Sequence, residues 1–136
     1  MDANERQVGG SHYKTDYEHW DLAVVVQMGY LEGCATKYVA RWRKKGVPLQ
    51  DLEKALHYHD KLIETAQFRW IPRIMQEVEI TSEVCRFVLA NKLSEKEHEY
   101  IHLICTYRSN IELQLARGIL LNLIEMQKDA NESTVL

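Results

Sequence analysis

The chain has 136 residues, of which 46% are hydrophobic and 27% are charged, a composition that is typical of a folded protein and unlike a disordered one. Its length allows one domain with a real core and is short for two. The formal net charge of -3 argues against nonspecific DNA binding, which usually needs a broad basic face. We therefore expect a single domain over residues 1–136.

The cysteines, the apolar runs and the first residues indicate the cellular compartment of the protein. Cys34, Cys85 and Cys105 lie far apart and form no CxxC pair, so neither a zinc knuckle nor a disulfide framework is suggested. No stretch approaches the roughly 18 to 20 apolar residues that span a bilayer. The start MDANERQ is polar and acidic, unlike a signal peptide. These features predict a cytoplasmic protein that does not bind a membrane.

Apolar residues recur at three- and four-residue spacing along most of the chain, which predicts an all-α bundle of about five to six helices after an N-terminal loop. The first helix is expected over residues 20–29, with Asp21 as N-cap and Gly29 as its stop. Its VVV run is also compatible with a short strand. The second helix is expected over residues 33–46, where basic residues in the last turn suit the helix dipole.

Pro48 then suits the first position of a long third helix over residues 47–67. Pro72 predicts a kink or a break after it. Two or three further helices follow, and the segments SEKE from Ser94 and SNIE from Ser109 both fit a capping box. The second of these segments can equally lie inside one long helix.

The end of the chain divides into an apolar stretch and a polar tail. Residues 115–126 are apolar on more than one face, which predicts burial in the core or between subunits. We therefore expect a homo-oligomer. Residues 129–136 are polar until the last two positions and are expected to fray.

The loop VGGSHYK, residues 8–14, gathers groups that can hold an anion. A glycine pair that ends at Gly10, followed by Ser11, lets the backbone approach a phosphate closely. His12 can contact a phosphate and Tyr13 can stack on a base. Spacing alone also describes a plain turn, in which His12 caps a helix and Tyr13 covers the edge of the core.

The second expected helix carries a cluster of cations. Lys37 and Arg41 lie four residues apart, Lys44 follows three residues later, and Lys45 comes next. Like charges at these spacings repel each other, so a compensating partner is needed. Acids of the next helix, such as Asp51, or solvent can supply it, and so can a bound anion. Periodicity leaves both interpretations open.

The third expected helix carries acids and a histidine at four-residue spacing, namely Glu53, His57, Asp60 and Glu64. Amphipathic helices often present such pairs, so we interpret them as surface charge and expect neither a metal nor a cofactor. The chain has no phosphate loop ending in GKS or GKT, no GxSxG and no HExxH. We assign no catalytic residue, and a binding module ranks above an enzyme.

Three blocks in a fixed order resemble a family of small phage proteins named domain of unknown function 3310. The pattern of that family is SHY, then KYxxRxxxKG, then DLxKAxxYxxxLI. The matching residues are Ser11, His12, Tyr13, Lys37, Tyr38, Arg41, Lys45, Gly46, Asp51, Leu52, Lys54, Ala55, Tyr58, Leu62 and Ile63. The resemblance implies a phage origin and a link to nucleotides, because one member is described as a phage nucleoside monophosphate kinase without the usual phosphate loop.

With this resemblance, the leading hypothesis is a phage-encoded nucleotide-binding protein in the cytosol of the bacterial host. It would sequester a nucleotide signal of host defence, as phage nucleotide sponges do. Residues 9–67 would hold the ligand, and residues 68–128 would be a helical extension for the core or for oligomerisation. The expected binding residues are Gly10, Ser11, His12, Tyr13, Trp20, Lys37, Arg41, Lys44 and Lys45.

Two alternatives stay open. The first is a phosphotransferase that acts on nucleoside monophosphates, in which Lys37 and Arg41 stabilise the transferred group and His12 or Asp51 handles the proton. The second is an inhibitor that binds a host protein through the apolar second half of the chain. In the leading hypothesis, by contrast, the ligand is a linear or cyclic nucleotide.

Overall fold

The computed structural model describes residues 3–5, 15–66 and 74–135. All regular structure in these residues is helical, which confirms the predicted all-α fold. A short 3-10 helix, η1, is followed by six α-helices. Their bounds are η1 Ala3–Glu5, α1 His19–Val25, α2 Tyr30–Arg41, α3 Pro48–Ala66, α4 Glu77–Asn91, α5 Glu95–Thr106 and α6 Asn110–Val135.

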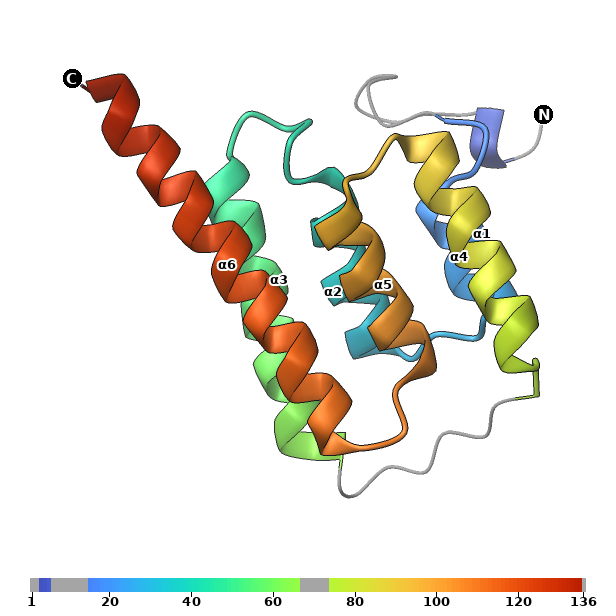
Figure 1. Cartoon of the computed structure of the whole chain (residues 1–136). Coiled ribbons are helices and arrows are strands. Elements are labelled where there is room, and N and C mark those ends of the chain that lie inside the picture. The colour runs from blue at the N-terminus through green and yellow to red at the C-terminus, as the bar shows by residue number, and fades with distance from the viewer. Residues whose placement is uncertain (1–2, 6–14, 67–73, 136) are drawn as a thin grey trace.

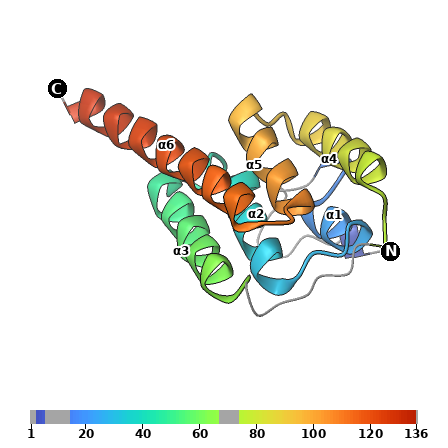
Figure 2. The same cartoon turned by 60° about the horizontal axis from the view of Figure 1, so that its bottom comes forward.

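The six α-helices form two layers (Figures 1 and 2). One layer consists of α1, α2 and α3, and the other consists of α4, α5 and α6. Helices α2 and α5 lie in the middle and pack on each other, and α2 makes its most extensive contact with α3. Helix α2 therefore lies against both its own layer and the opposite one.

A buried polar triad joins three helices inside the core. The Nε2 atom of His59 in α3 lies 2.8 Å from the carbonyl oxygen of Leu113 in α6, and its Nδ1 lies 2.9 Å from the hydroxyl of Tyr100 in α5. A carbonyl only accepts, so Nε2 carries the proton and Nδ1 accepts from Tyr100. Burial lowers the pKa of His59, which favours this neutral form.

The capping box predicted at Ser94 is confirmed, and its glutamate, Glu97, also contacts the residues that follow α2. The Ser94 hydroxyl accepts from the Glu97 amide, and the Ser94 amide donates to Glu97 Oε2 at 2.7 Å. The Oε1 atom of Glu97 accepts from the Trp42 indole at 2.7 Å and pairs with Arg43. This fully buried carboxylate therefore ties the start of α5 to the end of α2.

Three helix boundaries in the first half differ from the expected ones. Helix α1 begins at His19 with Glu18 as its N-cap, so Asp21 lies in the first turn and is not the cap. Gly29 is the N-cap of α2 rather than the stop of α1, because α1 ends at Val25 and Gln27 takes a positive φ of 58°. The VVV run does not form a strand: its first two residues belong to α1. Helix α2 ends at Arg41 instead of Gly46, because Trp42 and Arg43 turn toward Glu97.

In the second half, one boundary that the sequence left open is decided and another differs. A short connection separates α5 from α6, so SNIE lies at a helix start, where Glu112 Oε1 accepts from the Arg108 amide at 2.8 Å. Helix α6 continues to Val135 through the segment that was expected to fray, and its last turns project from the bundle (Figure 1). Pro72, where a break was predicted, lies outside the described residues.

Helix α6 buries one face and exposes another. Leu113, Ala116 and Leu120 are buried, whereas Ile111 and Leu115 are exposed. The apolar stretch therefore contributes to the core of one chain, and self-association stays a prediction. None of the described helices is long and apolar enough to cross a membrane.

The Glu97 contacts predict a large loss of stability on truncation. Glu97→Ala leaves the Trp42 indole, the Arg43 guanidinium and the Ser94 amide without their acceptor, at a cost of about 3 kcal/mol. Ser94→Ala, which removes only the cap, should cost about 1 kcal/mol. Urea unfolding followed by circular dichroism measures both values. Equal losses in the two variants would show that Glu97 acts as a cap alone.

Candidate functional site

Three cations surround the ring of one tyrosine where α2 packs on α3. The Lys37 Nζ lies 4.9 Å from the centroid of the Tyr38 ring, the Arg41 Cζ lies 4.8 Å away, and the Lys54 Nζ lies 5.5 Å away. Cations within about 6 Å of an aromatic centroid are attracted by the ring. We name these four residues the Tyr38 cluster. The shared ring partly offsets the repulsion among the three charges.

Helical geometry and packing together produce this arrangement. Lys37 and Arg41 are four residues apart on α2, so they lie on one face. Lys54 comes from α3, which is the helix that α2 contacts most extensively. The cluster therefore depends on tertiary packing as well as on local spacing.

Tyrosine rings continue from the cluster along the same pair of helices. The ring of Tyr58 stacks on that of Tyr38, with centroids 6.0 Å apart and planes at 13°. Tyr30 meets Tyr58 edge to face, at 6.3 Å and 80°. Because Tyr30 is 75% exposed, its ring offers an exposed aromatic surface at the end of the tyrosine row, two rings from Tyr38.

The cluster carries excess positive charge. Elsewhere in the described residues, basic side chains such as Arg43, Arg86 and Arg117 pair with carboxylates. Neither Lys37 nor Lys54 has an ion-pair partner within the described part of the chain. The expected pairing with acids of the next helix is therefore not found for Lys37, and the charges of both lysines are available to an anion.

A neutral histidine from α1 borders the cations. His19 Nε2 lies 2.8 Å from Thr36 Oγ1, and that hydroxyl lies 2.8 Å from the Glu32 carbonyl oxygen. The carbonyl takes the hydroxyl proton, so His19 donates from Nε2. Burial, and then the charges of Lys37 and Arg41, lower the pKa of His19 to about 4. His19 thus adds no charge near the cations at neutral pH.

One acid near the cluster is fully buried. Asp51 lies in the first turn of α3, and its side chain is 0% exposed. Both of its carboxylate oxygens are buried and have no hydrogen-bond partner among the described residues. Such unsatisfied groups are rare in native structures.

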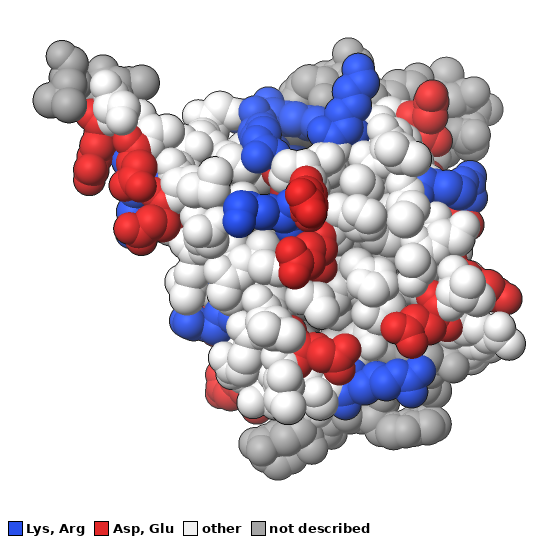
Figure 3. Space-filling model, viewed as in Figure 1, with Lys and Arg blue, Asp and Glu red and all other residues white. Residues whose placement is uncertain are grey.

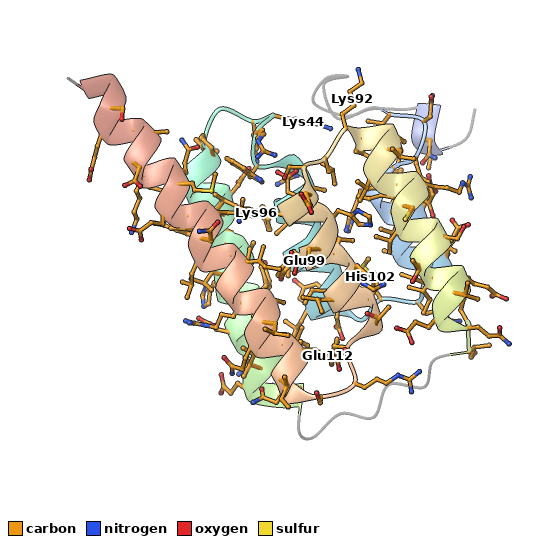
Figure 4. All side chains as sticks on the ribbon, viewed as in Figure 1. Lys44, Lys92, Lys96, Glu99, His102 and Glu112 are labelled. Carbon is orange, nitrogen blue, oxygen red and sulfur yellow. The ribbon has the colours of Figure 1, made fainter. Side chains whose placement is uncertain are left out.

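The structure brings together two of the binding residues expected from the sequence, Lys37 and Arg41. Lys44 and Lys45 lie in the turn that follows α2, because the helix ends before them, and Figure 4 shows Lys44 at this connection. Trp20 is half exposed, and its indole donates to Asn4. The expected residues Gly10, Ser11, His12 and Tyr13 lie outside the described residues.

Sequence reasoning missed His19, Lys54 and Tyr58 near the cations, and it named Tyr38 only as part of the family pattern. Tyr38 is only partly buried. The one available signal was the set of three family-like blocks, which contains Tyr38, Lys54 and Tyr58 but gives no reason for their proximity. Only the packing of α3 on α2 supplies that reason.

Charged side chains outside the cluster pair with each other or are spread over the surface. Asp60 pairs with Arg117 at 2.7 Å, which joins α3 to α6, and among the described residues no three potential ligands are grouped to hold a metal ion. On the α4–α6 side, basic and acidic side chains are interspersed (Figure 3). The Tyr38 cluster belongs to the other layer.

Comparison with known proteins gives one match. A family model described as a protein of unknown function (DUF3310) matches residues 8–60, which confirms the resemblance over this range. The matched range includes the whole Tyr38 cluster and Asp51 and ends within α3. No curated protein and no solved structure matches the chain. The phage origin and the link to nucleotides stay predictions.

The lowered pKa of His19 predicts a specific dependence of stability on pH. Its folded-state pKa of about 4 lies below the ordinary value of about 6.5, so the unfolded chain takes up a proton first as the pH falls. The stabilisation is complete above pH 6.5 and is lost as the pH falls toward 4, at up to about 1.4 kcal/mol per pH unit.

Urea unfolding at several pH values measures this effect, with His19→Gln as the control. The free energy of unfolding of the variant should depend less steeply on pH between 6.5 and 4, because the variant lacks the titration of His19. Some dependence remains, because other groups titrate in both proteins. Identical slopes would contradict the burial of a neutral His19.

Proposed function

We propose that this protein binds a phosphorylated nucleotide at the Tyr38 cluster. The observation that carries the proposal is the convergence of Lys37, Arg41 and Lys54 on one ring, where the two lysines have no carboxylate partner in the described part of the chain. Hydrogen bonds between such cations and a phosphate are charge-assisted and are stronger than neutral ones. A phosphate would also relieve the repulsion among the three charges.

The exposed aromatic surface at the end of the tyrosine row that starts at the cluster supports a nucleotide rather than a bare anion. Bases stack on aromatic side chains with little regard to their identity, and the Tyr30 ring is exposed at the end of the tyrosine row. This assigns to Tyr30 the stacking role that the sequence suggested for Tyr13 or Trp20. Lys44 and Lys45, which follow α2 directly, remain in the proposal as further phosphate contacts.

The proposal includes retention of the nucleotide without conversion. In the phage setting that the family resemblance implies, retention would remove a nucleotide signal of the host's defence. A nucleoside monophosphate kinase would use the same cations on a transferred phosphoryl group, so binding alone does not separate the two functions. Turnover does.

The double variant Lys37→Ala/Arg41→Ala tests the binding site. Each lost charge-assisted hydrogen bond is worth at least about 1.4 kcal/mol, so nucleotide affinity should fall about 100-fold or more. Isothermal titration calorimetry with nucleoside mono-, di- and triphosphates measures it. Affinity of the wild type should also fall with added salt, because the contacts are electrostatic.

Lys96→Ala/Lys128→Ala is the matched control, because it removes two exposed cations from α5 and α6, in the layer opposite the cluster. Figure 4 shows Lys96 on α5. It should leave the affinity unchanged. Lys44→Ala/Lys45→Ala should weaken binding less than the cluster variant. The proposal is wrong if the cluster variant and the control bind alike.

Incubation with a nucleoside triphosphate, Mg²⁺ and each monophosphate tests retention. We expect every nucleotide to be recovered intact by chromatography. Formation of diphosphate would establish the kinase function instead. If no nucleotide binds and one host protein is recovered in stoichiometric amount, the protein is an inhibitor.

A further inference from the structure

Asp51 is the exception among the buried acids of the described residues. These acids are Glu18, Glu32, Asp51 and Glu97. Glu18 accepts from the Thr15 amide, Glu32 accepts from the Tyr107 hydroxyl, and Glu97 accepts from Trp42. Both oxygens of Asp51 are buried without a hydrogen-bond partner in the part of the chain that the structure describes. An unpartnered buried carboxylate destabilises a fold by several kcal/mol, which indicates a role other than stability.

The position of Asp51 connects it to the Tyr38 cluster. Residues three and seven apart share one side of a helix, so Asp51, Lys54 and Tyr58 follow one another along the same side of α3. Lys54 and Tyr58 both contact the Tyr38 ring. Asp51 therefore lies one turn beyond the cluster along the contact between α2 and α3.

The chemistry of the group defines what can satisfy it. A carboxylate accepts hydrogen bonds and donates none, and the N-terminal end of α3 favours its negative charge. A phosphate at the cluster cannot pair with it, because like charges repel. A part of the same ligand that carries hydrogen-bond donors can.

We propose that Asp51 is the specificity residue of the nucleotide site and accepts hydrogen bonds from two adjacent donors of the ligand. This inference rests on the proposed function and adds the chemical class of the ligand. Adjacent donors occur on the cis-diol of a ribose and on the N–H edge of guanine. The carboxylate is covered in the ligand-free structure, so binding includes displacement of the side chains above it.

The unpartnered carboxylate also explains how other ligands are rejected. A nucleotide without the two donors leaves the carboxylate buried and unpaired, so it gains nothing there. Sites of this kind discriminate strongly between ligands that do and do not supply a hydrogen bond. Inorganic pyrophosphate contacts only the cations, so its affinity should not depend on Asp51.

The test compares the wild type with Asp51→Asn, which has nearly the same shape but replaces one acceptor by a donor. Calorimetry measures the affinities for GMP, dGMP, AMP, dAMP and pyrophosphate. We expect the variant to bind the preferred nucleotide at least 10-fold more weakly and pyrophosphate equally well. Preference of the wild type for GMP and AMP identifies the diol, and preference for GMP and dGMP identifies the base edge.

The outcomes separate this inference from the proposed function. If the wild type binds no nucleotide, the proposed function fails. If it binds nucleotides and Asp51→Asn keeps the same affinities, only the role of Asp51 fails. Circular dichroism and the melting temperature establish that the variant is folded. If the variant is not folded, the affinities of the wild type for the four nucleotides provide the test. Equal affinity for all four overturns the inference.

Discussion

The buried carboxylate of Glu97 fixes the position of α2, on which the rest of the structure depends. It accepts from the indole of Trp42, pairs with Arg43 and closes the capping box of α5. At the other end of α2, Glu32 accepts from the Tyr107 hydroxyl at 2.9 Å. A central helix held at both ends presents its remaining face to α3 and α1 in one orientation. The side chains that form the candidate site lie on that face.

The site combines charges that attract an anion with groups that limit what else can bind. The Tyr38 ring holds three cations within 5.5 Å of its centre, and burial keeps His19 neutral beside them. Without the ring, mutual repulsion would favour the separation of these side chains. Asp51 introduces a negative charge without neutralising the lysines, since it forms no ion pair with them. In the proposed site, affinity and specificity would thus come from different residues.

The spacing of residues in the sequence predicted those features that depend only on residues close together in the chain. The all-α fold, Pro48 at the start of α3, the Ser94 capping box and the proximity of Lys37 and Arg41 all follow from spacing along one helix. The approach of Lys54 and the burial of Asp51 depend on how α3 packs against α2, which no local pattern specifies. The early end of α2 has the same origin, because Glu97 is 55 residues from Trp42 in the chain.

The most direct test of the account is nuclear magnetic resonance of the lysine side chains during titration with a nucleoside monophosphate. The Nζ groups of Lys37 and Lys54 should shift in proportion to ligand bound, because the phosphate replaces water next to them. Lys96 and Lys128, which lie on other helices, should not move. Shifts confined to those two lysines, or no shift of Lys37 and Lys54 at saturation, would contradict an anion site at Tyr38.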